Sequence, residues 1–318
     1  MLKVGSDFSG IGAFNQALIK IGVDYEEIFA CDKDKYVRET FIENYGKPLY
    51  YPEDVYKREI PVEPLDIYMT SPPCQSFSTN GLRKGEADER GVLFYNSLEF
   101  IKYNNPKTFI FENVKGLVNH DKGITFKKWI DSLNELGEYN IYYKILNGLD
   151  FNIPQKRERI FIVGIRKDLN KIFNFPKPNP FTNYLENILE KENKKGTFYL
   201  EDLIYDNTFN DFVRLKTPTK LGYIDARFKR DAINFAFPKS KTRRGRVGVN
   251  YAQTIDTQCN QGIAIDGSNF RRFTINECVK LFGFNEDFKP NKNINQAYKQ
   301  FGNSIIVDKL EAIIKQLI

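Results

Sequence analysis

The sequence of 318 residues has a single histidine, His120, which disfavours a histidine-based catalytic triad or a multi-histidine metal site. Its four cysteines, Cys31, Cys74, Cys259 and Cys278, are far apart and form no CxxC pair. This spacing indicates neither a zinc site nor a disulfide framework, so we expect no bound metal. A cysteine with a chemical role is compatible with the same pattern.

Long apolar runs are also missing. No stretch approaches the roughly 20 residues that a helix needs to span a bilayer, so we expect no membrane partner. The opening residues MLKVGSD reach an acidic side chain at once and lack the basic, apolar and small-residue sections of a secretory signal. We therefore expect a cytoplasmic protein.

The composition is that of a globular protein, with 41% hydrophobic and 28% charged residues. A chain of this length buries a substantial core and holds one large domain, or one large and one small. The net charge of +6 fits a polyanionic partner, although many unrelated proteins share such a charge.

Short apolar, β-type runs alternate with amphipathic patterns in the first half of the chain. Helical patterns occur near residues 13–21, 34–44, 93–104 and 124–136. Strands are predicted at residues 2–6, 28–31, 65–70, 108–112, 139–145 and 159–165. This alternation is typical of a doubly wound α/β fold with a parallel sheet.

The alternation stops near Phe173, where the sequence FPKPNP begins a stretch rich in Pro, Asn and Lys. The following region contains the basic clusters KSKTRRGR and RR, which fit either a solvated loop or a nucleic-acid contact. Helical periodicity returns at 275–282 and 304–318, so we expect the end of the chain to pack back onto the first domain.

A glycine-rich turn, FSGIGAF, follows the first predicted strand and lets a ligand approach the backbone closely. Alone it fits a tight strand-to-helix turn equally well. Asp32 stands 20 residues after Gly12, at the end of the next strand, where a carboxylate accepts hydrogen bonds from ribose hydroxyls. The spacing is not GxGxxG and no Walker lysine follows, which favours an adenosine cofactor without phosphates.

Three further segments bring chemistry to the same sheet edge. Cys74 lies in the loop SPPCQSFS after the third strand, where two prolines hold the thiol in place, although a buried structural cysteine is the common alternative. Glu112 ends the next strand, and Arg157 and Arg159 precede another. Without a chemical role, Glu112 would simply be a solvated strand end, and the two arginines would form surface ion pairs.

The ordered set FSGIGAF, PPCQSFS, ENV, QKRER and QAYKQFGNS closely resembles the DNA cytosine-C5 methyltransferases of bacterial type II restriction-modification systems. The resemblance covers nearly the whole chain, and PPCQ, ENV and QKRER in this order are a specific combination. It implies a Rossmann-like, S-adenosyl-L-methionine-dependent methyltransferase sheet in residues 1–175, completed by 273–318. A smaller target-recognition domain would then span 176–272.

The resemblance also implies catalytic roles. Cys74 would add to C6 of a cytosine flipped out of double-stranded DNA, and Glu112 would hold a proton at N3. Arg159, and less directly Arg157, would hold the base carbonyl or a phosphate.

The same resemblance assigns residues to the cofactor and to DNA. The residue after Asp32 is Lys33, where many relatives carry a bulky side chain that stacks on adenine. The expected cofactor-binding residues are Phe8, Gly10, Ile11, Gly12, Asp32, Lys33, Asp54, Pro73, Asn303 and Ser304. The expected DNA-binding residues are Gln75, Ser78, Arg244 and Arg246, of which either arginine could correspond to the family arginine that braces the recognition domain.

Two alternatives stay open. A transfer-RNA cytosine methyltransferase shares the scaffold, but the Cys-Phe-Thr signature of that branch is absent. A catalytically silent nucleic-acid-binding relative would not need the intact set of chemical residues. We expect a monomer that protects DNA from a companion restriction endonuclease without forming a stable complex with it.

Overall fold

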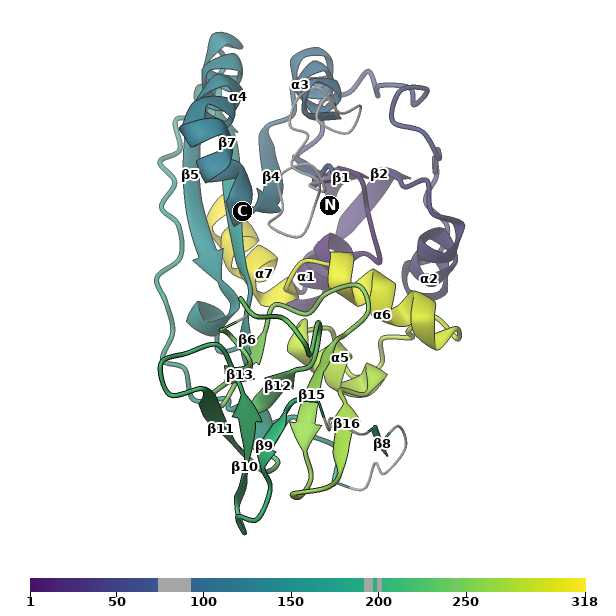
Figure 1. Cartoon of the computed structure of the whole chain (residues 1–318). Helices are drawn as coiled ribbons and strands as arrows, with labels where there is room; N and C mark the ends of the chain where they lie inside the picture. Colours follow the sequence, from purple (N-terminus) through teal and green to yellow (C-terminus); the bar gives the residue numbers. More distant parts are fainter. Residues whose placement is uncertain (74–92, 192–196, 199–201, 243) are drawn as a thin grey trace. The chain divides into compact units, whose positions relative to one another are not determined.

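The computed structural model describes residues 1–73, 93–191, 197–198, 202–242 and 244–318 (Figure 1). The chain divides into two compact units. The sheet unit comprises residues 1–146, 158–177 and 309–318, and the accessory unit comprises residues 147–157 and 178–308. These units are defined by compactness alone, so the expected assignment of 176–272 to target recognition and of 273–318 to the catalytic domain stays a prediction.

The sheet unit contains one six-stranded sheet with the strand order β2-β1-β3-β4-β7-β5. Its strands are β1 (Leu2–Asp7), β2 (Tyr25–Cys31), β3 (Ile67–Thr70), β4 (Thr108–Val114), β5 (Tyr139–Asn147) and β7 (Glu158–Arg166). All six lie close to the predicted positions. β1 pairs in parallel with β2 and β3, and β3 pairs in parallel with β4.

The prediction of an all-parallel sheet is wrong for β7, which runs antiparallel to β4. The short segment between β5 and β7 holds the 3₁₀ turn η3 (Gly148–Phe151) and the two-residue strand β6 (Gln155–Lys156) rather than a helix. Because a parallel connection needs a long crossover, this short return reverses the chain direction.

Helices cover both faces of the sheet (Figure 1). They are α1 (Ala13–Ile21), α2 (Lys35–Tyr45), α3 (Leu93–Asn104), α4 (Ile124–Glu135) and α7 (Val307–Leu317). On one face, Phe94 of α3 stacks on Trp129 of α4 with ring centroids 4.1 Å apart. On the other face, α1 contacts α2 through a hydrogen bond from the Tyr45 hydroxyl to Gln16, and α7 through the Lys20–Glu311 ion pair.

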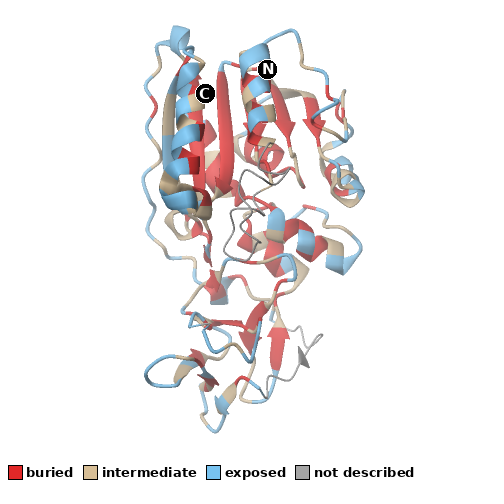
Figure 2. Cartoon of the chain, turned by 45° about the horizontal axis from the view of Figure 1, so that its top comes forward, coloured by how far each residue is buried: buried red, intermediate tan, exposed pale blue. Residues whose placement is uncertain are grey.

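Since both faces are covered, the central strands are buried along most of their length, as Figure 2 shows in red. The helices expose only their outer sides, which explains why their amphipathic periodicity was readable. None of the helices in the described ranges is long and apolar enough to cross a membrane.

The accessory unit is built mainly from short strands in three small sheets, with orders β11-β10-β9, β13-β12-β15-β16-β8 and β14-β6. The strands are β8 (Thr197–Phe198), β9 (Ile204–Asp206), β10 (Phe212–Lys216), β11 (Tyr223–Arg227), β12 (Ala232–Asn234), β13 (Val247–Gly248), β14 (Ala252–Gln253), β15 (Gln261–Ala264) and β16 (Phe270–Arg272). This unit also contains the 3₁₀ turn η5 (Leu185–Asn187), while the turns η2 (Lys115–Gly123) and η4 (Lys167–Leu169) belong to the sheet unit.

Two helices complete this unit, α5 (Ile275–Leu281) and α6 (Ile294–Asn303). α5 was predicted and begins with a capping box, in which Thr274 and Glu277 each bond the other's backbone N–H. α6 was not predicted. It carries the QAYKQFGN sequence, and Asn293 caps its first turn.

Candidate active site

The carboxyl ends of β1, β3 and β4 meet at one edge of the sheet, where chemical residues gather. The Ser71 hydroxyl, just after β3, donates to the Phe8 carbonyl oxygen at 3.3 Å. The Asn113 side chain, near the end of β4, donates to the Pro72 carbonyl oxygen at 3.3 Å. These two bonds tie the start of the SPPC loop to the glycine turn and to the ENV segment.

Sequence reasoning gave no role to Ser71 or Asn113, although both lie inside recognised motifs. Cys74 follows directly after Pro73, the last residue of this loop that is described. Cys74, Gln75 and Ser78 lie outside the described residues, so their predicted roles stay predictions.

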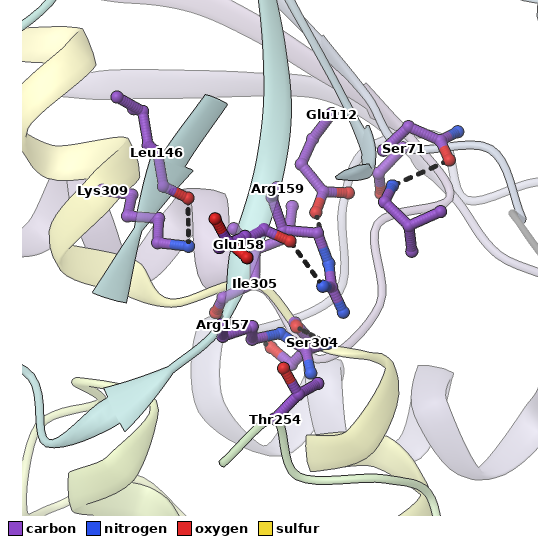
Figure 3. A network of polar contacts seen from close by, with 12 residues as sticks. Ser71, Glu112, Leu146, Arg157, Glu158, Arg159, Thr254, Ser304, Ile305 and Lys309 are labelled. Atoms are coloured by element: carbon purple, nitrogen blue, oxygen red, sulfur yellow. Dashed lines mark hydrogen bonds and ion pairs between the residues drawn. The ribbon is translucent and has the colours of Figure 1, made fainter. Parts of the chain in front are cut away.

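Glu112 and Arg159 point toward each other from adjacent strands (Figure 3). The Arg159 Nε atom lies 3.2 Å from Glu112 Oε1, and the two side chains are 12% and 10% exposed. The antiparallel pairing of β4 with β7 sets this contact, because it places the start of β7 beside the end of β4. Arg159 also donates to the Glu158 carbonyl oxygen at 2.8 Å.

Arg157 has a different environment, in the accessory unit. It is 2% exposed, and its guanidinium donates to the carbonyl oxygens of Ile255 at 3.1 Å, Gly302 at 2.8 Å and Ser304 at 2.8 Å. The guanidinium also lies over the Phe282 ring, 5.2 Å from its centroid. Arg157 therefore clamps the backbone of the GNS segment, and its predicted contact with the base or a phosphate stays a prediction.

The glycine-rich segment after β1 forms a tight turn with a left-handed backbone. Phe8, Gly10 and Gly12 have φ values of 55°, 56° and 79°. A Cβ atom at Gly10 would meet nothing nearer than the Phe8 carbonyl oxygen at 3.9 Å, so the backbone there is open to close approach. At Gly12, in contrast, a Cβ would lie 2.1 Å from the Tyr45 ring. The space beside Gly10 is therefore open, whereas the space beside Gly12 is filled by Tyr45 of α2.

Asp32 binds the same turn. Its Oδ2 atom accepts a hydrogen bond from the Gly10 backbone N–H at 3.0 Å, and its Oδ1 atom accepts one from Asp34 at 2.9 Å. Burial raises the pKa of the Asp32 carboxyl above its usual value, while these two hydrogen bonds act in the opposite direction. A carboxylate beside an open glycine turn at the end of β2 fits the ribose hydroxyls of an adenosine cofactor.

The other expected cofactor residues are spread over both units. Asp54 forms a turn in which its carboxylate accepts from the Tyr56 N–H at 3.0 Å. Lys33 is exposed and offers no ring for stacking, while Ile11 is 2% exposed and packs inside. Asn303 ends α6 and Ser304 follows it, both in the accessory unit, so their contact with the cofactor stays a prediction.

The two candidate DNA-binding arginines differ sharply. Arg246 is 1% exposed, whereas Arg244 is exposed. The Arg246 guanidinium donates to four carbonyl oxygens, those of Asn234, Ala236, Phe237 and Pro238 at 2.7 to 3.2 Å. Arg246 therefore braces the loop after β12, and a DNA contact by either arginine stays a prediction.

A doubly wound sheet with an open glycine turn, an acid after β2 and a carboxyl group at the end of β4 is the arrangement expected of the class of S-adenosyl-L-methionine-dependent methyltransferases. Within that class, the sequence-family model of the C-5 cytosine-specific DNA methylases matches residues 2–318. The chain belongs to this family.

Similar proteins agree with this family. The chain is 33% identical to the type II methyltransferase M.HhaI of Haemophilus parahaemolyticus, over 96% of the chain and 91% of the relative. It is 34% identical to M.NgoBI of Neisseria gonorrhoeae, over 98% of the chain and 92% of the relative. A putative DNA modification methyltransferase of an E. coli prophage has the same fold, with a TM-score of 0.72 at 19% identity, covering 100% of this chain and 98% of that one.

The protein is thus a DNA cytosine-C5 methyltransferase that uses S-adenosyl-L-methionine as its methyl donor. Its substrate is DNA. In the described part of the chain, no group of three His, Cys, Asp or Glu side chains is arranged to hold a metal ion.

Proposed function

We propose that this enzyme methylates a cytosine flipped out of a specific double-stranded DNA sequence, with Cys74 as nucleophile and Glu112 and Arg159 beside the base. The observation that carries the proposal is the Glu112–Arg159 pair, held 3.2 Å apart at the carboxyl end of β4, the same edge to which β3 delivers the SPPC loop. An acid and a guanidinium at that edge, with Cys74 assigned as the nucleophile from the motif alone, fit nucleophilic addition to a pyrimidine ring.

Each residue has one task in this scheme. The Cys74 thiolate forms a bond to C6 of cytosine, which makes C5 nucleophilic. Glu112 holds a proton at N3 while the ring gains electron density, and Arg159 orients the Glu112 carboxyl group and the base. When bound, S-adenosyl-L-methionine would supply an electrophilic methyl group for C5, and S-adenosyl-L-homocysteine would be the leaving group. Loss of the C5 proton to a base then allows the bond to Cys74 to break.

Asp32, the turn at residues 8–12, Asp54 and Pro73 are assigned to the cofactor. Asn303 and Ser304 are assigned to it as well, with Asn303 at its methionine end. The open backbone at Gly10 and the Asp32 carboxylate beside it support this assignment. Lys33 leaves the adenine without the stacking partner that many relatives have.

We further propose that the enzyme acts as a monomer in the cytoplasm, where bacterial DNA lies, and protects that DNA from a companion endonuclease. M.HhaI and M.NgoBI are named type II methyltransferases, which supports a restriction-modification role. Gln75, Ser78, Arg244 and Arg246 are the residues we assign to DNA binding or to the support of the binding loops.

The test is to trap the covalent intermediate. The protein is incubated with S-adenosyl-L-methionine and duplexes that carry 5-fluorocytosine in all short sequence contexts. Fluorine at C5 cannot leave as a proton does, so the Cys74–C6 bond should persist as a denaturant-resistant adduct. The Cys74→Ala variant should form none. Glu112→Gln should form it about 10²- to 10⁴-fold more slowly, the usual contribution of a general acid or base.

Glu158→Gln is the matched control, because Glu158 precedes Arg159 but pairs with Lys115 at the surface. It should form the adduct at the parent rate. An adduct that persists in Cys74→Ala would refute the assignment of the nucleophile. An adduct on transfer RNA and none on any duplex would refute the proposed double-stranded DNA substrate.

A further inference from the structure

A buried charged cluster lies at the end of β1, directly before the glycine turn, and the reaction scheme does not use it. We call it the Asp7 cluster; it consists of Asp7, Arg58, Tyr68 and Asn96. The side chains of Asp7 and Arg58 are 0% and 3% exposed, and Tyr68 is 0% exposed. All four residues belong to the sheet unit.

The carboxylate of Asp7 is the centre of this cluster. Arg58 Nε lies 2.8 Å from both oxygens of that carboxylate, and a second guanidinium nitrogen lies 2.7 Å from Oδ2. The Tyr68 hydroxyl donates to Oδ2 at 2.6 Å. Burial beside this carboxylate raises the pKa of Tyr68 well above its usual value, so the phenol stays a proton donor.

The position of Asp7 in the sheet is central. It is the last residue of β1, directly before Phe8 and the glycine turn. In the strand register it pairs with Cys31, which precedes Asp32, and with Thr70, which precedes Ser71. The backbone that Asp7 anchors therefore leads to the glycine turn and lies between the segments that carry Asp32 and the SPPC loop.

Arg58 connects this point to the segment that carries Asp54. It donates to the Asn96 side-chain oxygen at 3.1 Å, and Asn96 in turn donates to the carbonyl oxygen of Val55 at 3.3 Å. The guanidinium also lies over the Phe100 ring, 4.4 Å from its centroid. Val55, which follows Asp54, is thus linked through the side chains of Asn96 and Arg58 to the end of β1.

Stability alone does not explain such a cluster. Removing two charges from water is unfavourable, and well-packed apolar side chains of similar volume stabilise a core equally well or better. A two-pronged arginine–carboxylate contact does, however, fix distance and orientation, which apolar packing defines less sharply.

We propose that the Asp7 cluster positions the cofactor site: it holds the glycine turn at residues 8–12 and the Asp54 segment in fixed register, and so sets the affinity for S-adenosyl-L-methionine. Arg58 is thereby a positioning residue that touches neither substrate nor cofactor. This inference rests on the proposed cofactor roles of those two segments.

The decisive variant replaces the cluster by apolar side chains, in the triple substitution Asp7→Leu, Arg58→Leu and Tyr68→Phe. Because no charge is left unpaired, the fold should keep its melting temperature within a few degrees. The dissociation constant for S-adenosyl-L-methionine, measured by calorimetric titration, should rise about tenfold or more, since small displacements of binding groups weaken binding strongly. The KM for this cofactor should rise in parallel, while kcat at saturating cofactor stays near the parent value.

Leu133→Ala is the control for a general loss of stability, because Leu133 is a buried residue of α4 that is not part of the cluster. It should lower the melting temperature and leave cofactor affinity unchanged. A triple variant that binds the cofactor as tightly as the parent would overturn the inference.

If the triple variant does not fold, Arg58→Lys decides the question, since lysine keeps the positive charge but lacks the planar guanidinium that contacts both carboxylate oxygens. Its cofactor affinity should fall in a folded protein, and parent-like affinity would overturn the inference. Failure of the proposed function would show in the parent protein itself. The parent would then bind S-adenosyl-L-methionine without methylating DNA, or would not bind the cofactor at all.

Discussion

Glu27 on β2 shows how a single residue couples stability to pH. Its Oε2 atom accepts a hydrogen bond from the Asn15 side chain at 2.9 Å, while its Oε1 atom is inaccessible to solvent and has no partner among the described residues. Burial raises the pKa of Glu27 from 4.5 to about 7, with the Asn15 hydrogen bond opposing the shift. The folded protein therefore keeps this proton at a pH where the unfolded chain has lost it.

The sign of the effect on stability follows from linkage. Below about pH 4.5 both states are protonated and Glu27 adds no pH dependence, and between pH 4.5 and 7 its contribution falls as pH rises. We expect Glu27→Gln to raise the free energy of unfolding at pH 8 by up to about 3 kcal/mol, and by much less at pH 5. Urea unfolding at both values checks this, with Glu26→Gln on the same strand as control. An equal effect of Glu27→Gln at both pH values would contradict the expectation.

At the scale of an element, α1 is bounded by two glycines with nearly the same backbone. Gly12 before the helix has φ 79° and ψ 37°, and Gly22 after it has φ 75° and ψ 32°. Their surroundings differ, since a Cβ at Gly22 would have no neighbour within 4 Å, whereas one at Gly12 would lie 2.1 Å from the Tyr45 ring. Alanine substitutions at the two positions therefore distinguish the cost of a left-handed backbone from the cost of a steric clash.

Gly22→Ala should lower the free energy of unfolding by about 1–2 kcal/mol, the usual penalty of a left-handed backbone with a side chain. Gly12→Ala should lower it by more, because α2 must move, and should also weaken S-adenosyl-L-methionine binding. Denaturant unfolding and calorimetric titration of the cofactor measure the two effects. Equal losses in both variants would show that Tyr45 yields freely and that packing does not require a glycine at position 12.

At the scale of the whole molecule, the net charge of +6 governs the encounter with DNA. Cations that neutralise phosphates release counterions, so DNA affinity should fall steeply with salt, by at least about tenfold between 50 and 200 mM. Affinity for the cofactor, for which we propose a buried carboxylate and backbone groups as the binding site, should change little over the same range. Fluorescence anisotropy with a labelled duplex and calorimetric titration of the cofactor measure the two dependences.

The exposed cations of the accessory unit should account for part of this dependence. Replacing Lys241 and Arg244 by Gln should make the slope of log affinity against log salt shallower by about one for each phosphate contact removed. Lys47→Gln, an exposed cation of the sheet unit, is the control. A slope that these two replacements leave unchanged would place the phosphate contacts elsewhere on the molecule.

The sequence by itself determined the local elements and the order of the motifs. The predicted strands at 108–112 and 159–165 became Thr108–Val114 and Glu158–Arg166, because β-branched and aromatic runs between polar turns specify strands locally. The glycine turn was readable for the same reason, since the left-handed backbone at Gly10 and Gly12 is a property of a few consecutive residues. Motif order was enough to indicate the family.

Only the tertiary structure decided which side chains meet. Arg157 and Arg159 are two residues apart in one motif, yet Arg159 faces Glu112 and Arg157 clamps three carbonyl oxygens, because β7 starts between them and turns antiparallel to β4. Asp7 and Arg58 are separated by 51 residues, and no local pattern links them. Local periodicity encodes the faces of an element, whereas contacts between distant residues depend on the strand order and direction that the folded core alone establishes.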